Sequence, residues 1–256
     1  MKTMKTPAAD LRGANLAALV LVDGAGSGAP GDRDAIQEIR AWLGLYASSL
    51  VPDDCVCPVV GAAAIRCNDH SGVARAALVP LLPRLIGSRG SAALTRRRQW
   101  AVADTVIRES TPARLAAIAA RPGLSEEQRE QILGWRDRLA AIPAVIDDAS
   151  RAAARVVVGS ARAAAAAAAA YDVDDDAFVA LNGAYAYAYA ACACDTHAVA
   201  PVDPVDPVDA VYADAFGGYA AAYDAFGVYA YDPGDAGIAA VALLCRLLDM
   251  TEESAR

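Results

Sequence analysis

Residues 91–150 read SAALTRRRQW AVADTVIRES TPARLAAIAA RPGLSEEQRE QILGWRDRLA AIPAVIDDAS, and they predict three consecutive helices. The second helix is expected to begin at Thr111-Pro112, because threonine supplies a capping oxygen and proline lacks an N–H group that the first turn would leave unpaired. Arg121-Pro122-Gly123 ends that helix. Ser125 and Gln128 then have the spacing of a capping box, which predicts the start of the third helix.

Apolar side chains recur at helical spacing in two of these helices, which indicates one buried face on each. The first helix also carries Asp104 and Arg108 four residues apart, so the two can pair along its surface. Exposed, that pair contributes only about 0.2–0.5 kcal/mol, whereas a buried pair would specify register; the sequence leaves both open. The residues expected on the buried faces are Trp100, Ala103, Val106, Ile107, Ile132, Leu133, Trp135, Leu139 and Ile142.

The composition of the whole chain points to the same fold class. Hydrophobic residues make up 56% of the 256 residues and aromatics only 6%, and much of the apolar content is alanine, the best helix former. The core is therefore expected to be helix on helix, and the fold an all-α multi-helix bundle with an Ala/Tyr-rich C-terminal helical segment. Arginine far outnumbers lysine, with 21 against two, as is typical of a GC-rich genome.

The chain divides into three parts by composition. Residues 1–33 are expected to be an N-terminal tail ending in a Gly-rich linker whose glycines lack the spacing of a phosphate-binding loop, so no nucleotide cofactor is predicted. Residues 34–171 are expected to form a helical domain. Residues 172–256 are expected to form an acidic Ala/Tyr-rich helical segment, with a Pro-Val-Asp spacer at 201–209 that favours extended backbone.

Further helices are predicted on both sides of the central stretch. Asp34 is expected to cap a helix over residues 34–50, and a second helix runs from Pro58 to about Asp69. Residues 73–87 read as a helix interrupted at Pro80 and Pro83. Two more helices are expected over residues 148–171 and 236–250, the latter with Ile238, Val241, Leu244, Cys245 and Leu248 facing inward.

Charge is distributed unevenly along the chain. Residues 1–162 contain 21 basic and 16 acidic side chains, whereas residues 163–256 contain two basic and 15 acidic ones. The two parts are therefore expected to attract one another, within one chain or between copies. The acidic part argues against nucleic acid or an anionic membrane as its partner, and a nucleic-acid partner is left to the Arg-rich first half.

The location of the protein is predicted from its apolar segments. The run from Leu16 to Val22 is preceded by charged residues and is followed by no small-residue cleavage pattern, so no signal peptide is expected. No strongly apolar run reaches the 18 residues of a membrane span. We therefore expect a cytoplasmic protein with no membrane partner.

The cysteines and histidines offer the sharpest chemical hypothesis. Cys55, Cys57, Cys67 and His70 are four potential ligands in one stretch, and thiolate and imidazole are the usual ligands of zinc. They predict a zinc or iron site, structural or catalytic. The alternative is that these cysteines are small buried core residues, since Cys-x-Cys is not the common zinc spacing. Cys192, Cys194 and His197 form a second, weaker group.

Three further patterns each allow two interpretations. The run Arg96-Arg97-Arg98 fits phosphate contact or a solvated helix face. The aspartate pairs at 53–54 and 147–148 and the run at 174–176 fit a divalent cation, although capping of helices is preferred because no calcium-loop spacing is present. A seven-residue aromatic repeat predicts a partner surface or packing within the chain; it consists of Tyr212, Phe216, Tyr219, Tyr223 and Phe226.

The order of several short motifs resembles a group of uncharacterised all-helical proteins of actinobacteria and their phages. The resemblance covers residues 52–165 and implies a soluble all-helical protein from a GC-rich host. It carries over no catalytic residue. The motifs are Pro52-Asp53-Asp54-Cys55-Val56-Cys57-Pro58-Val59, Arg66-Cys67-Asn68-Asp69, Leu82-Pro83-Arg84-Leu85-Ile86-Gly87-Ser88, Arg96-Arg97-Arg98, Ala103-Asp104 with Val106 and Arg108, Thr111-Pro112, and Ile142-Pro143 with Asp147.

These patterns favour a non-enzymatic interaction or assembly protein that binds a protein partner or itself. No nucleophile motif is present, and with two histidines in all, general acid–base catalysis would depend on carboxylates. The first alternative is a metal-binding protein that uses the Cys55/Cys57/Cys67/His70 group. The weaker one is a nucleic-acid-binding protein that uses its arginines.

Overall fold

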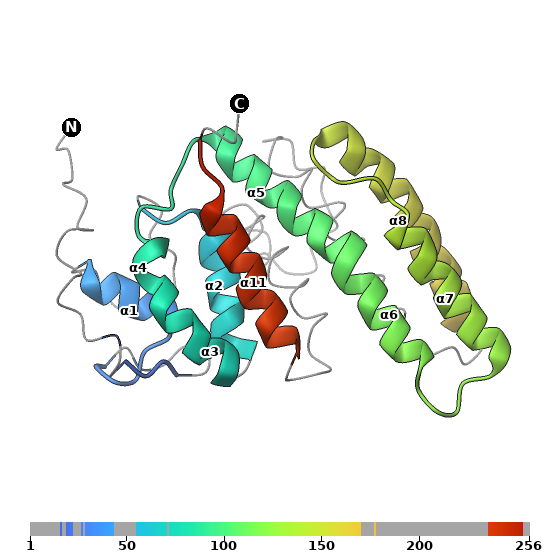
Figure 1. Cartoon of the computed structure of the whole chain (residues 1–256), viewed down its shortest axis with the longest axis horizontal. Helices are drawn as coiled ribbons and strands as arrows, with labels where there is room; N and C mark the ends of the chain where they lie inside the picture. Colours follow the sequence, from blue (N-terminus) through green and yellow to red (C-terminus); the bar gives the residue numbers. More distant parts are fainter. Residues whose placement is uncertain are drawn as a thin grey trace, which may run out of the picture. The chain divides into compact units, whose positions relative to one another are not determined.

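The computed structural model of the chain is all-helical in the part that it describes (Figure 1). It describes residues 19–22, 29–43, 55–70, 72–169 and 235–252, together with the single residues 16, 27 and 177. No strand occurs among these residues, which confirms the predicted all-α fold class.

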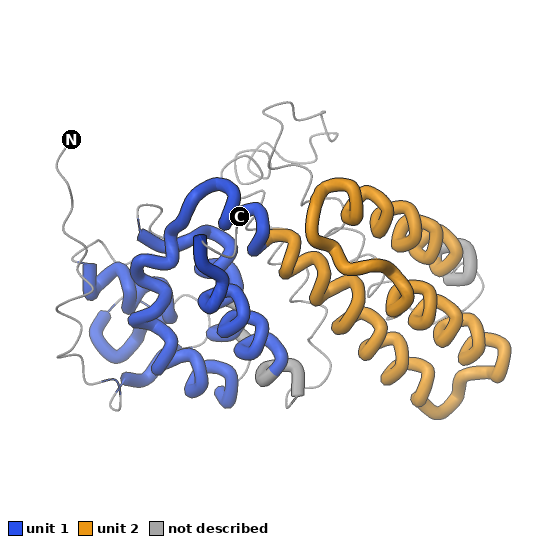
Figure 2. The backbone as a smooth tube through the Cα atoms, turned by 45° about the horizontal axis from the view of Figure 1, so that its top comes forward, with its two compact units in different colours: residues 1–98, 232–256 blue, residues 99–231 orange. Residues whose placement is uncertain are grey.

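The chain folds into two compact units (Figure 2). Unit 1 comprises residues 1–98 and 232–256, and unit 2 comprises residues 99–231. This division differs from the expected domain over residues 34–171, because the last helix, α11 (Asp235–Asp249), packs on α2 and α3 of unit 1. Unit 1 is therefore built from two separate parts of the sequence.

Most elements of unit 1 follow the predicted boundaries, but the helix expected over residues 34–50 ends at Trp42. The elements are α1 (Ala35–Trp42), α2 (Pro58–His70), α3 (Gly72–Leu78), the short 3₁₀ helix η4 (Val79–Leu81), α4 (Leu82–Leu85), the first turns of α5 (Ala92–Asp104) and α11. Pro80 and Pro83 each lie near the start of a new short helix, because proline cannot donate the backbone hydrogen bond that a continuing helix needs. The predicted interruptions are thus confirmed.

Apolar residues from α1, α3, α4 and α11 fill the core of unit 1. Their largest fully buried members are Ile36, Ile39, Leu78, Leu82, Leu85 and Leu243.

The face that α11 buries differs from the predicted one. Leu244 is buried as expected, whereas Val241, Cys245 and Leu248 are only half-buried. The fully buried positions are instead Ala240, Leu243, Leu244 and Leu247. The reason is that α11 contacts two helices, α2 and α3, and the larger leucines at a four-residue spacing bury more apolar area than Val241 or Cys245 would.

Buried polar groups fix the start of α1. Asp34 caps this helix through a complete capping box with Gln37, as the sequence predicts for Asp34. Asn68 of α2 is fully buried, accepts a hydrogen bond from the Ala35 N–H (3.2 Å) and donates one to the Val22 carbonyl (2.8 Å). Asn68 therefore holds two separate segments of chain against α2.

Unit 2 contains the rest of α5, the π-helical segment η5 (Thr105–Ser110), α6 (Thr111–Ala119), α7 (Glu126–Ala140) and α8 (Asp148–Ala169). Helix α7 packs against α6 and α8. Most of the predicted buried faces are confirmed, with Trp100 and Leu133 only half-buried. The main core side chains are Val106, Ile107, Leu115, Ile118, Ile132, Trp135 and Leu139.

Helix α6 begins at Thr111 as predicted, but the predicted cap by the Thr111 side chain is wrong. Ser110 and Thr111 both have right-handed helical backbone angles and no side-chain cap is present, so the helix continues through this point as the π-segment η5. Pro112 lacks an N–H group, and its ring would clash with the carbonyl four residues earlier in an α-helix. The wider π register accommodates the proline, and the apolar face running from Ile107 to Leu115 stays buried.

The turn between α6 and α7 forms as predicted. Gly123 has a φ of +95°, a conformation that favours glycine, and Ser125 and Gln128 form the complete capping box. Arg129 reaches back and donates a hydrogen bond to the Ala119 carbonyl at the end of α6 (2.6 Å). The end of one helix and the start of the next are therefore satisfied by local side chains.

Candidate functional site

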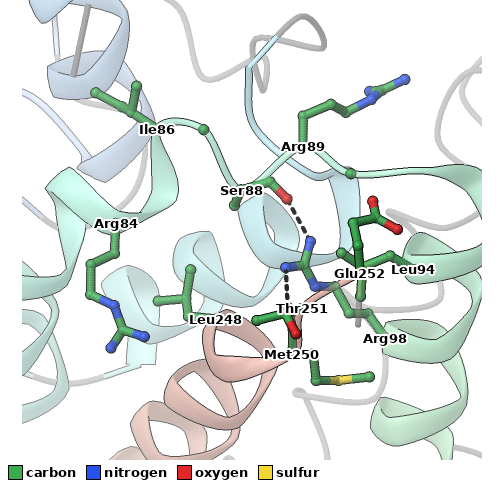
Figure 3. A pocket seen from close by; sticks show the side chains of 12 residues that line it. Arg84, Ile86, Ser88, Arg89, Leu94, Arg98, Leu248, Met250, Thr251 and Glu252 are labelled. Atoms are coloured by element: carbon green, nitrogen blue, oxygen red, sulfur yellow. Dashed lines mark hydrogen bonds between the residues drawn. The ribbon is translucent and has the colours of Figure 1, made fainter. Parts of the chain in front are cut away.

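A pocket of about 280 Å³ lies in unit 1 where α11 ends (Figure 3). Three segments form its walls: the loop over residues 84–90, the start of α5, and residues 248–252. Its polar lining includes three arginines and one glutamate. These charged residues are Arg84, Arg89, Arg98 and Glu252.

Arg98 is the organising residue of this pocket. Its side chain is 3% exposed, and its guanidinium donates to three backbone carbonyls: Leu247 (3.0 Å), Ser88 and Met250 (3.1 Å). Two of these bonds are drawn in Figure 3. Because the last carbonyls of a helix have no partner within the helix, Arg98 satisfies the end of α11 and ties it to the loop before α5.

Two acidic side chains lie in this region, and one of them, Glu252, lines the pocket. Asp249, the last residue of α11, pairs with Arg84 at 2.6 Å. Glu252 accepts hydrogen bonds from the Ser91 N–H (2.6 Å) and the Ser91 hydroxyl (2.8 Å). The N-terminus of α5 favours negative charge, so Glu252 satisfies it. This part of unit 1 thus binds carboxylates from its own chain.

Gly90 is required for this arrangement. A Cβ atom at residue 90 would lie 2.6 Å from Leu94 Cδ2 and 2.8 Å from Glu252 Oε1. Both distances are too short for a side chain, so Leu94 and Glu252 would have to move. The close approach of Glu252 to the backbone therefore depends on glycine at this position.

The run Arg96-Arg97-Arg98 does not form a single solvated face. Arg98 is buried on backbone carbonyls, whereas Arg96 and Arg97 are half-buried. Successive helical residues point about 100° apart, so α5 can bury Arg98 while Arg96 and Arg97 keep partial access to solvent. Sequence reasoning missed Arg98 because its carbonyl partners Leu247 and Met250 are distant in sequence.

The predicted metal ligands lie at different places along α2. The Cys57 carbonyl accepts the first hydrogen bond of α2, from Gly61 (2.8 Å), whereas Cys67 lies in the third turn. A rise of 1.5 Å per residue separates these two cysteines by about 15 Å along the helix, too far for one tetrahedral ion. His70 belongs to α2 as well.

The cysteines have other surroundings instead. The Cys57 N–H donates to Ser88 Oγ (3.0 Å), and its sulfur lies 3.9 Å from Thr95 Oγ1. Burial, with a smaller contribution from the nearby Cys245, raises the pKa of the Cys67 thiol to about 12. Within the described residues, no group of three or more His, Cys, Asp or Glu side chains is arranged to hold a metal ion. The metal-binding hypothesis stays a prediction.

A second polar cluster lies in unit 2, where α5 meets the start of α8. Asp104 pairs with Arg108 (3.1 Å) and also accepts a hydrogen bond from the Val145 N–H (2.7 Å). The pair that the sequence left open is thus half-buried, and Asp104 also ties the end of α5 to the loop before α8. Asp148 accepts from Trp100 Nε1 at 3.4 Å.

Arg151 is the least satisfied member of this second cluster. It is 5% exposed, and its Nη2 lies 3.2 Å from Asp148 Oδ1. In the part of the chain that the structure describes, its Nε and Nη1 atoms and the buried Thr111 hydroxyl have no hydrogen-bond partner. These atoms are so closely covered that no ligand reaches them, so we assign the cluster a structural role.

The start of α8 matches the capping interpretation of Asp147. Asp147 Oδ1 accepts a hydrogen bond from the Ser150 N–H (2.7 Å), and this bond, together with one from the Ser150 hydroxyl, lowers the pKa of the carboxyl group. The remaining predicted positions lie outside the described residues: the aspartates at 53–54 and 174–176, the second cysteine group at 192–197, and the aromatic repeat at 212–226.

Searches against protein-family models, curated proteins and solved structures gave no match. None of the described helices combines the length and the apolar character that a membrane crossing needs. The resemblance to actinobacterial and phage proteins stays a prediction.

Proposed function

We propose that this chain is a helical assembly protein that associates with copies of itself through opposite charge. The observation that carries the proposal is the segregation of charge: 21 basic and 16 acidic residues in 1–162, against two basic and 15 acidic in 163–256. Oppositely charged surfaces accelerate association and orient the partners.

Contacts within unit 1 support this proposal. Asp249 and Glu252, both from the acidic part of the chain, are bound by Arg84 and by the N-terminus of α5. The same chemistry is available to acidic residues of another copy. We place the assembly in the cytoplasm, because the four described cysteines are all free thiols and thiols stay reduced in that compartment.

The test is the mass of the full-length protein in solution, measured by light scattering and sedimentation over a range of concentrations and salt. Raising the salt from about 0.1 M to about 1 M shortens the Debye length from roughly 10 Å to roughly 3 Å. We expect a concentration-dependent oligomer at low salt that dissociates at high salt. A monomer at every protein and salt concentration would refute the proposal. An oligomer whose mass does not change with salt concentration would refute its electrostatic basis.

A further inference from the structure

Residues 70–98 form an unusually basic stretch within unit 1. They contain six arginines and no acidic residue. Two of the six have structural roles: Arg75 donates to the Asn68 carbonyl of α2 (2.7 Å), and Arg98 is buried at the end of α11. The other four arginines remain at the surface.

These four residues, Arg84, Arg89, Arg96 and Arg97, are called the arginine surface here. They lie on α4, on the loop that follows it, and on the second turn of α5. The Arg84 side chain is 44% exposed, and Arg89 is exposed and extends outward from the loop (Figure 3). Within the described part of the chain, the side chains of Arg89 and Arg97 make no ion pair or hydrogen bond, although the Arg89 backbone N–H donates to the Cys55 carbonyl (3.2 Å).

The surroundings of the arginine surface already bind acidic groups. Arg84 holds Asp249, and the adjoining N-terminus of α5 holds Glu252. Both carboxylates lie beside the pocket that Arg89 also lines. The geometry of this region therefore accepts carboxylates, while Arg89 and Arg97 still have unused positive charge.

The complementary part of the chain is long and uniformly acidic. Residues 163–245 contain twelve aspartates and no lysine or arginine. Four of the aspartates are concentrated in the run Asp172, Asp174, Asp175 and Asp176, and three more recur in the Pro-Val-Asp repeat. A segment with this charge is attracted to any cluster of exposed arginines.

We propose that the arginine surface is the docking site for the acidic segment 163–245 of a second copy of this chain. This inference rests on the self-association proposed above and names the surface that carries it. Each exposed ion pair contributes little, so the contact depends on several arginines acting together. Guanidinium groups suit this role because they pair with carboxylates through two parallel hydrogen bonds.

The test compares two full-length variants with the same change in net charge. R89E/R97E reverses two arginines of the arginine surface, and R136E/R138E reverses two arginines on α7 of unit 2. We expect the association constant of R89E/R97E to fall at least about tenfold, as the loss of two or more exposed charge pairs predicts. R136E/R138E is expected to associate like the unchanged protein.

A variant on the acidic side provides a second measurement. Replacing Asp172, Asp174, Asp175 and Asp176 with asparagine removes four charges, and we expect it to weaken association of the otherwise unchanged protein. Combined with R89E/R97E, it is expected to weaken association by less than the two separate losses together, because it also removes the repulsion from the new glutamates. Circular dichroism and melting temperature check that each variant is folded.

The outcomes separate this inference from the function it rests on. If the unchanged protein assembles and both double variants are affected alike, the arginine surface is overturned while self-association stands. If the unchanged protein is monomeric throughout, both fail. A third outcome is that no oligomer forms, that the unchanged protein binds short duplex DNA at low salt, and that only R89E/R97E loses this binding. The arginine surface would then bind nucleic acid, and our inference would be overturned.

Discussion

Arg98 of unit 1 and Arg151 of unit 2 are equally hidden from solvent and very differently satisfied. Arg98 is 3% exposed and donates to three backbone carbonyls. Arg151 is 5% exposed and contacts only one carboxylate oxygen, while two of its nitrogens have no partner among the described residues. Burial alone therefore says nothing about whether an arginine stabilises a fold.

The difference lies in what surrounds each guanidinium. The end of α11 and the loop before α5 present carbonyl oxygens that need donors, so burying Arg98 removes unpaired groups from both sides. The start of α8 already satisfies its own N–H groups through Asp147 and Ser150, and offers Arg151 no carbonyl. Removing each arginine should thus have opposite consequences.

The largest effect is expected for Arg98→Met. This substitution leaves three carbonyls without this donor, two of them in buried hydrogen bonds. Hydrogen bonds to a charged group are each worth about 1.5–3 kcal/mol, so we expect the free energy of unfolding to fall by about 3 kcal/mol or more. Urea unfolding measures the change. Arg97→Met is the control at the neighbouring half-buried position, and equal losses for the two variants would contradict our account of Arg98.

The helix caps of the two units give the next largest effects. Asp34 caps α1 in a buried position, whereas Ser125 caps α7 in an exposed one. Losing a cap costs about 0.5–2 kcal/mol, and an N–H group without access to water is the more costly to leave unpaired. We expect Asp34→Ala to cost about 2 kcal/mol and Ser125→Ala about 1 kcal/mol.

The same unfolding experiment measures both cap variants. Ser160→Ala is a control in an exposed position of α8, where the hydroxyl only donates to a carbonyl of its own helix. A larger loss for Ser125→Ala than for Asp34→Ala would show that burial does not set the cost of these caps.

Arg151→Met is expected to have the opposite sign to Arg98→Met. Replacing a poorly paired buried charge with an apolar side chain of similar size is often neutral or stabilising, so we expect the free energy of unfolding to stay unchanged or rise by about 1 kcal/mol. Hydrogen exchange of α8 locates the change. A loss comparable to that of Arg98→Met would contradict the unpaired state of the Arg151 Nε and Nη1 atoms within the described part of the chain.

The smallest effect concerns Cys67 at alkaline pH. Its folded-state pKa is raised from 9.0 to about 12, because burial disfavours the thiolate and Cys245 adds to the effect. As the pH rises, the thiol of the unfolded chain loses its proton before the thiol of the folded chain does. The stability that the protonated Cys67 contributes is therefore complete below pH 9.0 and is lost as the pH rises from 9.0 to about 12. We expect Cys67→Ala to flatten the decline of melting temperature with pH, and an unchanged slope would contradict the raised pKa.

Local signals were predictable from the sequence, and long-range contacts were not. The caps at Asp34 and Ser125 depend on residues within one turn, so their spacing alone identifies them. Arg98 and Asn68 depend on partners that the fold brings close, and nothing near them in the sequence marks those partners. The cap predicted at Thr111 fails for the converse reason: the local signal is present, but the helix runs on through Ser110 and Thr111 because its apolar face stays buried.

The candidate site follows the same rule. The arginine run at 96–98 was visible in the sequence, whereas the contrast between buried Arg98 and half-buried Arg97 depends on the packing of α11. Cys57 and Cys67 are only ten residues apart in the sequence, which suggested one ligand set. In the structure the rise of 1.5 Å per residue along α2 separates them by about 15 Å.

Helix α11 belongs to unit 1 but is synthesised after unit 2, and this order has a consequence for folding on the ribosome. Unit 1 closes only when residues 235–249 join residues 1–98, and all of residues 99–231 are made in between. At roughly 5–20 residues per second, a ribosome needs on the order of ten seconds for that interval. During this time the nascent chain exposes the apolar positions of α2 and α3 that α11 later covers, so the emerging N-terminal part is a natural client for chaperones that shield unfinished cores.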